Sequence, residues 1–211
     1  MTSDQPITTA APSDVPLFPL QAVLFPGGLL TLKVFEARYL DLMSACLRTH
    51  KPFGVVALRQ GSEVRKPGEP VALEETGVLA ELLDVDSTQP GILHVRCRRM
   101  QRFEMSGMKQ QADGLWLSQI ALLDEDEATL PTDAMVETVR GLANAIATLK
   151  QQGAEPFLKP FQFDNAGWVA NRWCEILPIS LAAKQKLMEL PDAAVRLQLV
   201  DEFLRSKGVV K

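Results

Sequence analysis

The chain has 211 residues, of which 46% are hydrophobic and 23% charged, so a core can form without disulfide or metal support. The formal net charge of −4 argues against tight non-specific binding of nucleic acid, which depends on neutralising phosphates. The three cysteines, Cys46, Cys97 and Cys174, are too far apart in sequence to indicate a disulfide framework or a zinc site. We expect three buried free thiols in a reducing cytoplasm, with no cofactor and no metal.

The N-terminal residues 1–14 are rich in Thr, Ser, Pro and Ala and contain no aromatic residue. They lack the basic and apolar regions of a secretory signal, so we interpret them as a disordered tail. The longest apolar run, residues 15–35, contains three prolines, two glycines, Gln21 and Lys33. A membrane span needs about 20 mostly uninterrupted apolar residues, so this run predicts no span.

The opening segment, residues 16–28, places Pro16, Pro19 and Pro26 among large apolar residues and ends in Gly27-Gly28. Prolines at this spacing forbid a helix and confine a strand to a sheet edge or a bulge. The apolar content requires burial. We therefore expect a stiff, buried and irregular segment.

Residues 29–123 mostly have the pattern of strands, interrupted by one helix over residues 36–48. Residues 53–59 and 78–85 are apolar on both faces, which is typical of central strands. Residues 93–97 and 103–105 alternate apolar with polar and suggest the two arms of a hairpin, and a further strand follows at 115–122. Turn signals between these runs favour an antiparallel meander or barrel over a parallel sheet; they are Pro67-Gly68, Pro90-Gly91 and Asp113-Gly114.

After the acidic run Asp124–Glu127 the apolar residues recur at helical spacing. A long helix reaches Gly153, and three shorter helices follow. Their expected N-caps are Asp164 or Asn165, then Ser180, then Asp192. In the last helix we place Val195, Leu199 and Phe203 on the inner stripe. Such short connections predict helices that pack as neighbours in a bundle.

The pattern therefore predicts an α+β fold with four parts. These are the disordered tail 1–14, a β-rich subdomain over 15–123, an acidic linker over 124–131 and a helical bundle over 132–211. We expect the linker to be solvated, because four consecutive acids do not have the ligand spacing of a cation site.

No sequence pattern for catalysis is present. The sequence contains neither a phosphate-binding loop nor a nucleophile elbow, and it has no paired metal ligands. His50 is expected in a loop and His94 on the outer face of a strand, and both are interpreted as solvated residues. We therefore do not expect an enzyme.

The strongest electrostatic feature is the cluster Arg96, Arg98, Arg99 and Arg102. Three of these side chains, Arg96, Arg98 and Arg102, form a candidate patch for a phosphate backbone or an acidic peptide. The alternative is a solvated strand face that acidic residues balance.

Several segments in order resemble one known family, the N-terminal substrate-binding domain of the ATP-dependent protease Lon. The resemblance runs from about Pro16 to Leu204 and covers nearly the whole chain. The residues that carry it are Leu17–Leu20, Leu24–Gly28, Phe35–Tyr39, Pro52–Val56, Gly77–Ala80, Arg102-Phe103, Leu177-Pro178, Lys184–Lys186 and Leu190.

This resemblance implies a six-stranded PUA-like pseudo-barrel followed by a helical subdomain. It also implies a stand-alone bacterial protein that lacks the ATPase and serine–lysine peptidase modules of Lon. Phe25, Phe35 and Tyr39 are candidates for a binding groove, although core packing is the competing interpretation for these aromatic residues.

Three functions remain open from the sequence. The first is a non-enzymatic module that binds exposed apolar segments of unfolded or partner polypeptides. The second is RNA binding through a PUA-like barrel and the arginine cluster. The third is a small-molecule site where the barrel meets the helices, with Trp168 and Trp173 either lining it or filling the bundle core. The sequence does not predict the oligomeric state.

Overall fold

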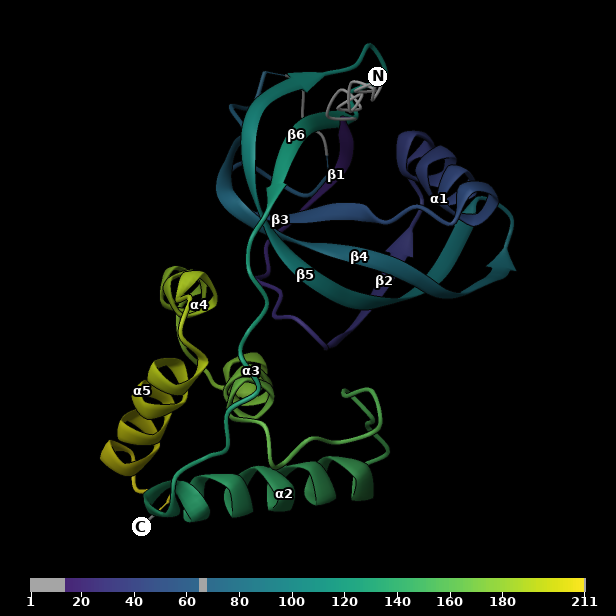
Figure 1. Ribbon diagram of the computed structural model, residues 1–211. Coiled ribbons are helices and arrows are strands. Elements are labelled where there is room, and N and C mark those ends of the chain that lie inside the picture. The colour runs from purple at the N-terminus through teal and green to yellow at the C-terminus, as the bar shows by residue number, and fades with distance from the viewer. Residues whose placement is uncertain (1–13, 65–67, 211) are drawn as a thin grey trace, which may run out of the picture.

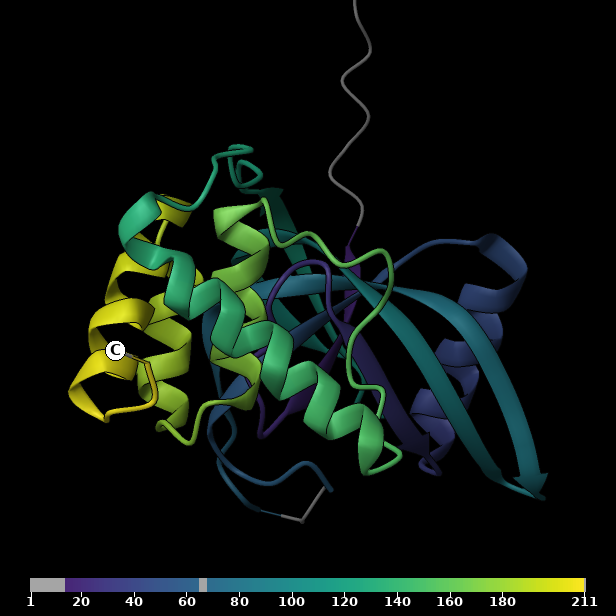
Figure 2. The same ribbon diagram turned by 90° about the horizontal axis from the view of Figure 1, so that it is seen from below.

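The structure is a computed structural model that describes residues 14–64 and 68–210, so residues 1–13 of the expected tail 1–14 and Pro67 of the expected turn lie outside the described residues. The strands are β1 (Val15–Leu20), β2 (Leu29–Val34), β3 (Phe53–Gln60), β4 (Ala72–Gln89), β5 (Ile92–Gln110) and β6 (Trp116–Leu122). The helices are α1 (Ala37–Thr49), a 3-10 turn (Asp133–Met135), α2 (Val136–Gln151), α3 (Ala166–Ile176), α4 (Leu181–Glu189) and α5 (Ala193–Ser206). Helices α2–α5 lie on one side of the strands and α1 lies on another (Figures 1 and 2).

The strands form one mixed sheet in the order β2-β5-β4-β3-β1-β6, and β6 also pairs with β5. Strands β1, β3, β4, β5 and β6 therefore form a closed cycle of pairings, with β2 added to β5. All pairings are antiparallel except that of β1 with β3, which is parallel. The expectation of a purely antiparallel arrangement is thus wrong for the pairing of β1 with β3, because β2 and α1 lie between these two strands in the chain and return it in the same direction.

Strand β1 contains two prolines and yet lies between two other strands. It pairs with β6 over Val15–Leu17 and with β3 over Leu17–Leu20, so Leu17 alone has a partner on both sides. Pro16 and Pro19 each have one neighbouring strand, and the missing N–H at each can face the side without a partner. The prediction that the prolines place this segment at a sheet edge is therefore wrong for β1 as a whole. It holds for each half of β1, because each half is paired with a neighbouring strand mainly on one side.

The two apolar runs expected as arms of a hairpin belong to one continuous strand, β5. Its first half pairs with β2 from Leu93 to Arg98, and its second half pairs with β6 from Phe103 to Gln110. A register shift against β4 falls between these halves, and such irregularities increase twist and let one strand serve two neighbours.

One core joins the strands to the helices. The main cluster of buried apolar residues contains Phe25 and Val95 from the β region together with Leu142 and Trp173 from α2 and α3. A second, smaller cluster lies among the strands alone and consists of Leu17, Val56, Leu58, Leu73, Leu79 and Phe103. The helices therefore cover a face of the sheet that would otherwise expose apolar surface.

The predicted caps of the C-terminal helices are confirmed. Asn165 accepts a hydrogen bond from the Trp168 amide, Ser180 caps α4 and Asp192 caps α5. The predicted inner stripe of α5 is wrong for Val195 and Leu199, which are each 43% exposed, whereas Phe203 is partly buried against the main core. The buried face instead carries Arg196, Leu197, Val200, Asp201 and Leu204. Neighbouring helix positions differ by about 100°, so burial of Arg196 turns Val195 toward solvent.

Candidate functional site

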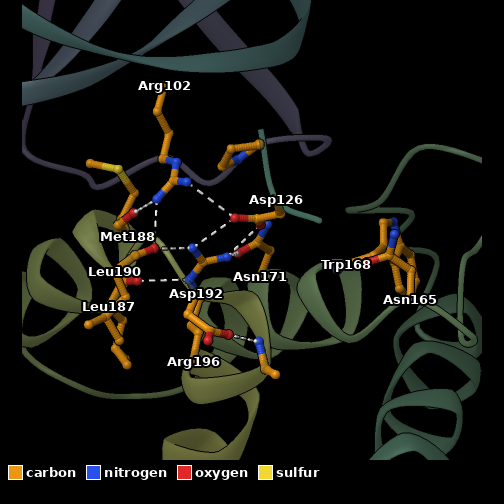
Figure 3. A network of polar contacts seen from close by, with 12 residues as sticks. Arg102, Asp126, Asn165, Trp168, Asn171, Leu187, Met188, Leu190, Asp192 and Arg196 are labelled. Carbon is orange, nitrogen blue, oxygen red and sulfur yellow. Dashed lines mark hydrogen bonds and ion pairs between the residues drawn. The ribbon is translucent and has the colours of Figure 1, made fainter. Parts of the chain in front are cut away.

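The strands and the C-terminal helices are joined by a buried ion network around Asp126 (Figure 3). Arg196 of α5 binds the Asp126 carboxylate through both terminal nitrogens, at 2.6 and 3.1 Å, and Arg102 of β5 lies 3.2 Å from the same group. Nη1 of Arg102 also donates to the carbonyls of Met188 and Leu190, at 2.9 and 2.7 Å. The network therefore fixes the α4–α5 corner to the sheet.

This network changes the interpretation of two predicted features. Arg102 is 4% exposed and its donors are engaged inside the molecule, so it does not form one surface patch with Arg96 and Arg98. Asp126 is half-buried between two arginines, so the prediction of a solvated acidic run is wrong for this residue. Asp124, Glu125 and Glu127 are exposed, as that prediction requires.

A second network lies at the double glycine. The Glu175 carboxylate of α3 accepts hydrogen bonds from Arg99 at 2.5 Å and from Arg172 at 2.6 Å. Nη2 of Arg172 also donates to the Pro26 carbonyl at 2.8 Å. A Cβ at Gly28 would lie 2.5 Å from Glu175 Oε1, so glycine is required for this close approach. Burial lowers the pKa of Arg99, and the Glu175 carboxylate opposes that shift.

A cleft of about 630 Å³ opens beside both networks, where the sheet meets the helices. Its exposed charged residues have both signs, with Arg98 and Lys159 on the basic side and Asp124 and Glu125 on the acidic side. Met100, Leu158 and the buried Trp168 supply apolar surface. Trp168 therefore lines the junction, as one alternative expected. Trp173 is in the helical core, where its indole nitrogen donates to the Thr138 carbonyl at 3.0 Å.

The three aromatic candidates for a binding groove do not share one exposed surface. Phe25 is fully buried, and Tyr39 is 4% exposed and stacks on Phe18 with ring centroids 4.1 Å apart. Burial raises the pKa of Tyr39 to about 12. Phe35 is 51% exposed and is the candidate that faces solvent. Phe25 and Tyr39 therefore lie in the core, as the interpretation that competes with a binding groove requires.

Nearby, Glu36 and Arg38 form an ion pair at 2.8 Å. Arg38 also donates to the Gly114 carbonyl at 2.9 Å, which ties the start of α1 to the turn before β6. The charged residues at the start of α1 therefore make contacts that hold the fold together.

Arg96 and Arg98 lie on the exposed face of β5, where acidic residues of β4 stand opposite them. Arg98 is paired in register with Glu81, at 3.9 Å between charged atoms, and Arg96 is in register with Asp84. His94 is in register with Asp86 in the same way. This face therefore carries adjacent rows of opposite sign, and pairs of this kind weaken the attraction for a polyanion.

Sequence reasoning missed Asp126 and Glu175 as partners of the arginine cluster, and Arg196 as the second arginine that binds Asp126. A signal was present in α5, where Arg196 lies on one helical stripe with the apolar Val200 and Leu204. A charged residue on an apolar stripe requires a buried counterion. The identity of that counterion, 70 residues away in the chain, carried no local signal.

Three further observations concern the described residues alone. No helix among them is long and apolar enough to cross a membrane. No group of three or more His, Cys, Asp or Glu side chains in residues 14–64 and 68–210 is arranged to hold a metal ion. Cys46, Cys97 and Cys174 are buried free thiols, as predicted.

The sheet, the helices and the junction between them define a mixed α and β domain with the Lon N-terminal fold. The Lon N-terminal domain protein from Xanthomonas campestris has a TM-score of 0.69 and 26% identity, covering 89% of this chain and 96% of its own. The N-terminal domain of Mycobacterium avium complex Lon protease shares the fold, with a TM-score of 0.59 and 15% identity, over 92% of this chain and 98% of its own.

The chain belongs to the family of the ATP-dependent protease La (LON) substrate-binding domain, which matches residues 14–206. Lon protease of Paraburkholderia phytofirmans is 28% identical over 199 residues, covering 92% of this chain and 24% of the relative. Lon protease 1 of Syntrophobacter fumaroxidans is 24% identical over 195 residues, with the same shares. The chain thus spans about a quarter of the length of these relatives. The matched part is the substrate-binding domain, which is non-catalytic.

Proposed function

We propose that this protein is a non-catalytic module that binds exposed apolar segments of unfolded or partner polypeptides. The observation that carries the proposal is the match of residues 14–206 to a family of substrate-binding domains. Exposed apolar side chains on β4, on α1 and just before α1 support it, because their burial on binding is favourable; they include Phe35, Leu47 and Leu83.

A binding experiment with a permanently unfolded protein tests this proposal. Reduced, carboxymethylated α-lactalbumin is titrated into the full chain, and the same protein with its disulfides intact serves as the matched control. We expect saturable binding of the unfolded form alone, with a negative heat-capacity change from apolar burial. Equal affinity for the two forms, or no affinity for either, would contradict the proposal.

A second candidate is a small-molecule site in the junction cleft. Its volume of about 630 Å³ falls in the usual range for ligand pockets, and charged groups of both signs line it. A fragment screen by NMR tests this candidate. Amide shifts that cluster at Arg98, Lys159 and Asn165 would support it, and a screen without such shifts would remove it.

RNA binding remains the third candidate, and the acidic row opposite Arg96 and Arg98 weighs against it. An electrophoretic shift with structured RNA at low salt, abolished by Arg98→Glu, is the result that would favour it.

We also propose that the cycle of strand pairings is a PUA-like pseudo-barrel over residues 15–123, with 124–131 as the linker and the helical subdomain over 132–211. The proposed setting is the bacterial cytoplasm.

A further inference from the structure

Strand β4 has an edge without a neighbouring strand. Its pairing with β3 ends where Phe53 meets Ala80, whereas β4 continues alongside β5 as far as Gln89. Beyond Ala80, no other strand of residues 14–64 and 68–210 pairs with this side of β4. The main-chain N–H and C=O groups that point away from β5 are therefore open to a further strand.

A groove of about 560 Å³ runs along this edge, between β4 and the end of α1. It lies where β3 would continue if the chain were extended before Phe53. Instead, the chain turns before Phe53. Helix α1 ends just before His50, whose φ of 53° is left-handed and redirects the chain toward β3. The lining residues are Cys46, Leu47, His50, Lys51 and Glu81–Val85.

The two faces of this edge differ in chemistry. Leu82 and Val85 point inward and pack against the main core, in register with the buried Cys97 and Val95. At the groove, Leu47 and Leu83 are 48% and 41% exposed, and Leu83 sits at a register shift. The acidic row that is in register with β5 follows the same edge and consists of Glu81, Asp84 and Asp86; Glu81 and Asp84 also line the groove.

We propose that an extended polypeptide segment binds here as an added strand of the sheet, with apolar side chains in the groove and basic side chains beside the acidic row. The unpaired main chain selects an extended segment, because only a strand meets its donors and acceptors in register. The alternation of faces selects a segment in which apolar and basic residues alternate. The inference rests on the proposed function and names the site and the substrate class.

The probe is a fluorescent peptide of alternating valine and lysine, as long as the unpaired part of β4. Two matched peptides accompany it, one with glutamate in place of lysine and one with every backbone amide N-methylated. Titrated into the full chain, each control is expected to bind about tenfold more weakly than the probe. Amide shifts of the labelled protein are expected to concentrate at residues 81–86.

A charge reversal locates the site on the protein. Asp84→Lys is expected to weaken the valine–lysine peptide about tenfold and to strengthen the valine–glutamate peptide. Glu202→Lys, on the exposed face of α5, makes the same change of charge elsewhere and is expected to leave both affinities unchanged. The dispersed amide spectrum of each variant establishes that it is folded.

Two results separate failure of this inference from failure of the proposed function. If unfolded α-lactalbumin binds but N-methylation and Asp84→Lys change nothing, or the shifts lie at the junction cleft, the β4 edge is the wrong site and the proposed function stands. If neither unfolded α-lactalbumin nor any peptide binds, both the function and the site are wrong.

Discussion

Asp126 joins the sheet to the helices through two buried arginines. Its carboxylate serves Arg102 and Arg196, whose side chains are 4% and 1% exposed. Asp126→Asn would leave two buried guanidiniums without a counterion, and we expect the helices to lose about 3 kcal/mol of their free energy of unfolding. Urea denaturation measures the change.

The matched control is Asp124→Asn, which makes the same substitution two residues earlier at an exposed side chain. It should change the free energy of unfolding by no more than about 0.5 kcal/mol. Equal effects of the two substitutions would show that the Asp126 network contributes nothing beyond general electrostatics.

The buried thiols make stability depend on alkaline pH. Burial raises the pKa of Cys97 and of Cys174 from 9.0 to about 12. The unfolded chain releases these protons near pH 9 while the folded chain keeps them, so stability is full below pH 9 and falls as pH rises toward 12. Each thiol is expected to contribute a slope of about 1.4 kcal/mol per pH unit in this window.

Denaturant midpoints measured across that window test the expectation. Cys97→Ala lowers stability at every pH through the lost packing, but it should also reduce the slope by about 1.4 kcal/mol per pH unit, the share of one thiol. A slope that Cys97→Ala leaves unchanged would assign the alkaline loss to other groups.

Among the elements, the packing of β3, β4 and β5 depends on a glycine beneath an aromatic ring. Gly77 is in register with Phe103, and a Cβ at this position would lie 2.6 Å from Phe103 Cζ and 2.6 Å from the Val55 carbonyl oxygen. Because the carbonyl cannot move away, we expect Gly77→Ala to lower the free energy of unfolding by about 2 kcal/mol. Urea denaturation of Gly77→Ala, Phe103→Leu and the double variant tests this, and the two losses should not add.

The elements also show which parts of the fold were predictable. The caps Asn165, Ser180 and Asp192 were predicted because each bonds to an amide two or three residues away. The orientation of α5 was not, because apolar spacing favoured Val195 and Leu199 while a distant carboxylate buried Arg196. Patterns of local contacts are visible in the sequence, whereas a buried ion pair depends on partners that the fold brings together.

The same distinction applies to the candidate sites. The arginine cluster was evident in the sequence, but its division into the exposed Arg96 and Arg98 and the buried Arg99 and Arg102 follows from the packing of β5 against the helices. The open edge of β4 was not located from the sequence. Its location depends on where β3 ends, which the apolar run 78–85 did not reveal.

At the scale of the whole molecule, the question is whether sheet and helices unfold together. They share the main core, and the networks at Asp126 and Glu175 cross between them. We therefore expect a single cooperative transition, in which the strands and helices lose structure at the same denaturant concentration.

The three tryptophans allow a direct test, because Trp116 is in β6 and the other two are in α3. In a variant with Trp168→Phe and Trp173→Phe, fluorescence follows the strands while far-UV ellipticity mainly follows the helices. The two urea midpoints should coincide in this background and separate when Asp126→Asn is added, with the helices unfolding first. If the midpoints coincide both with and without Asp126→Asn, the shared apolar core alone couples the strands to the helices. If the midpoints are separate in both variants, residues 15–123 and 132–211 are independently stable domains.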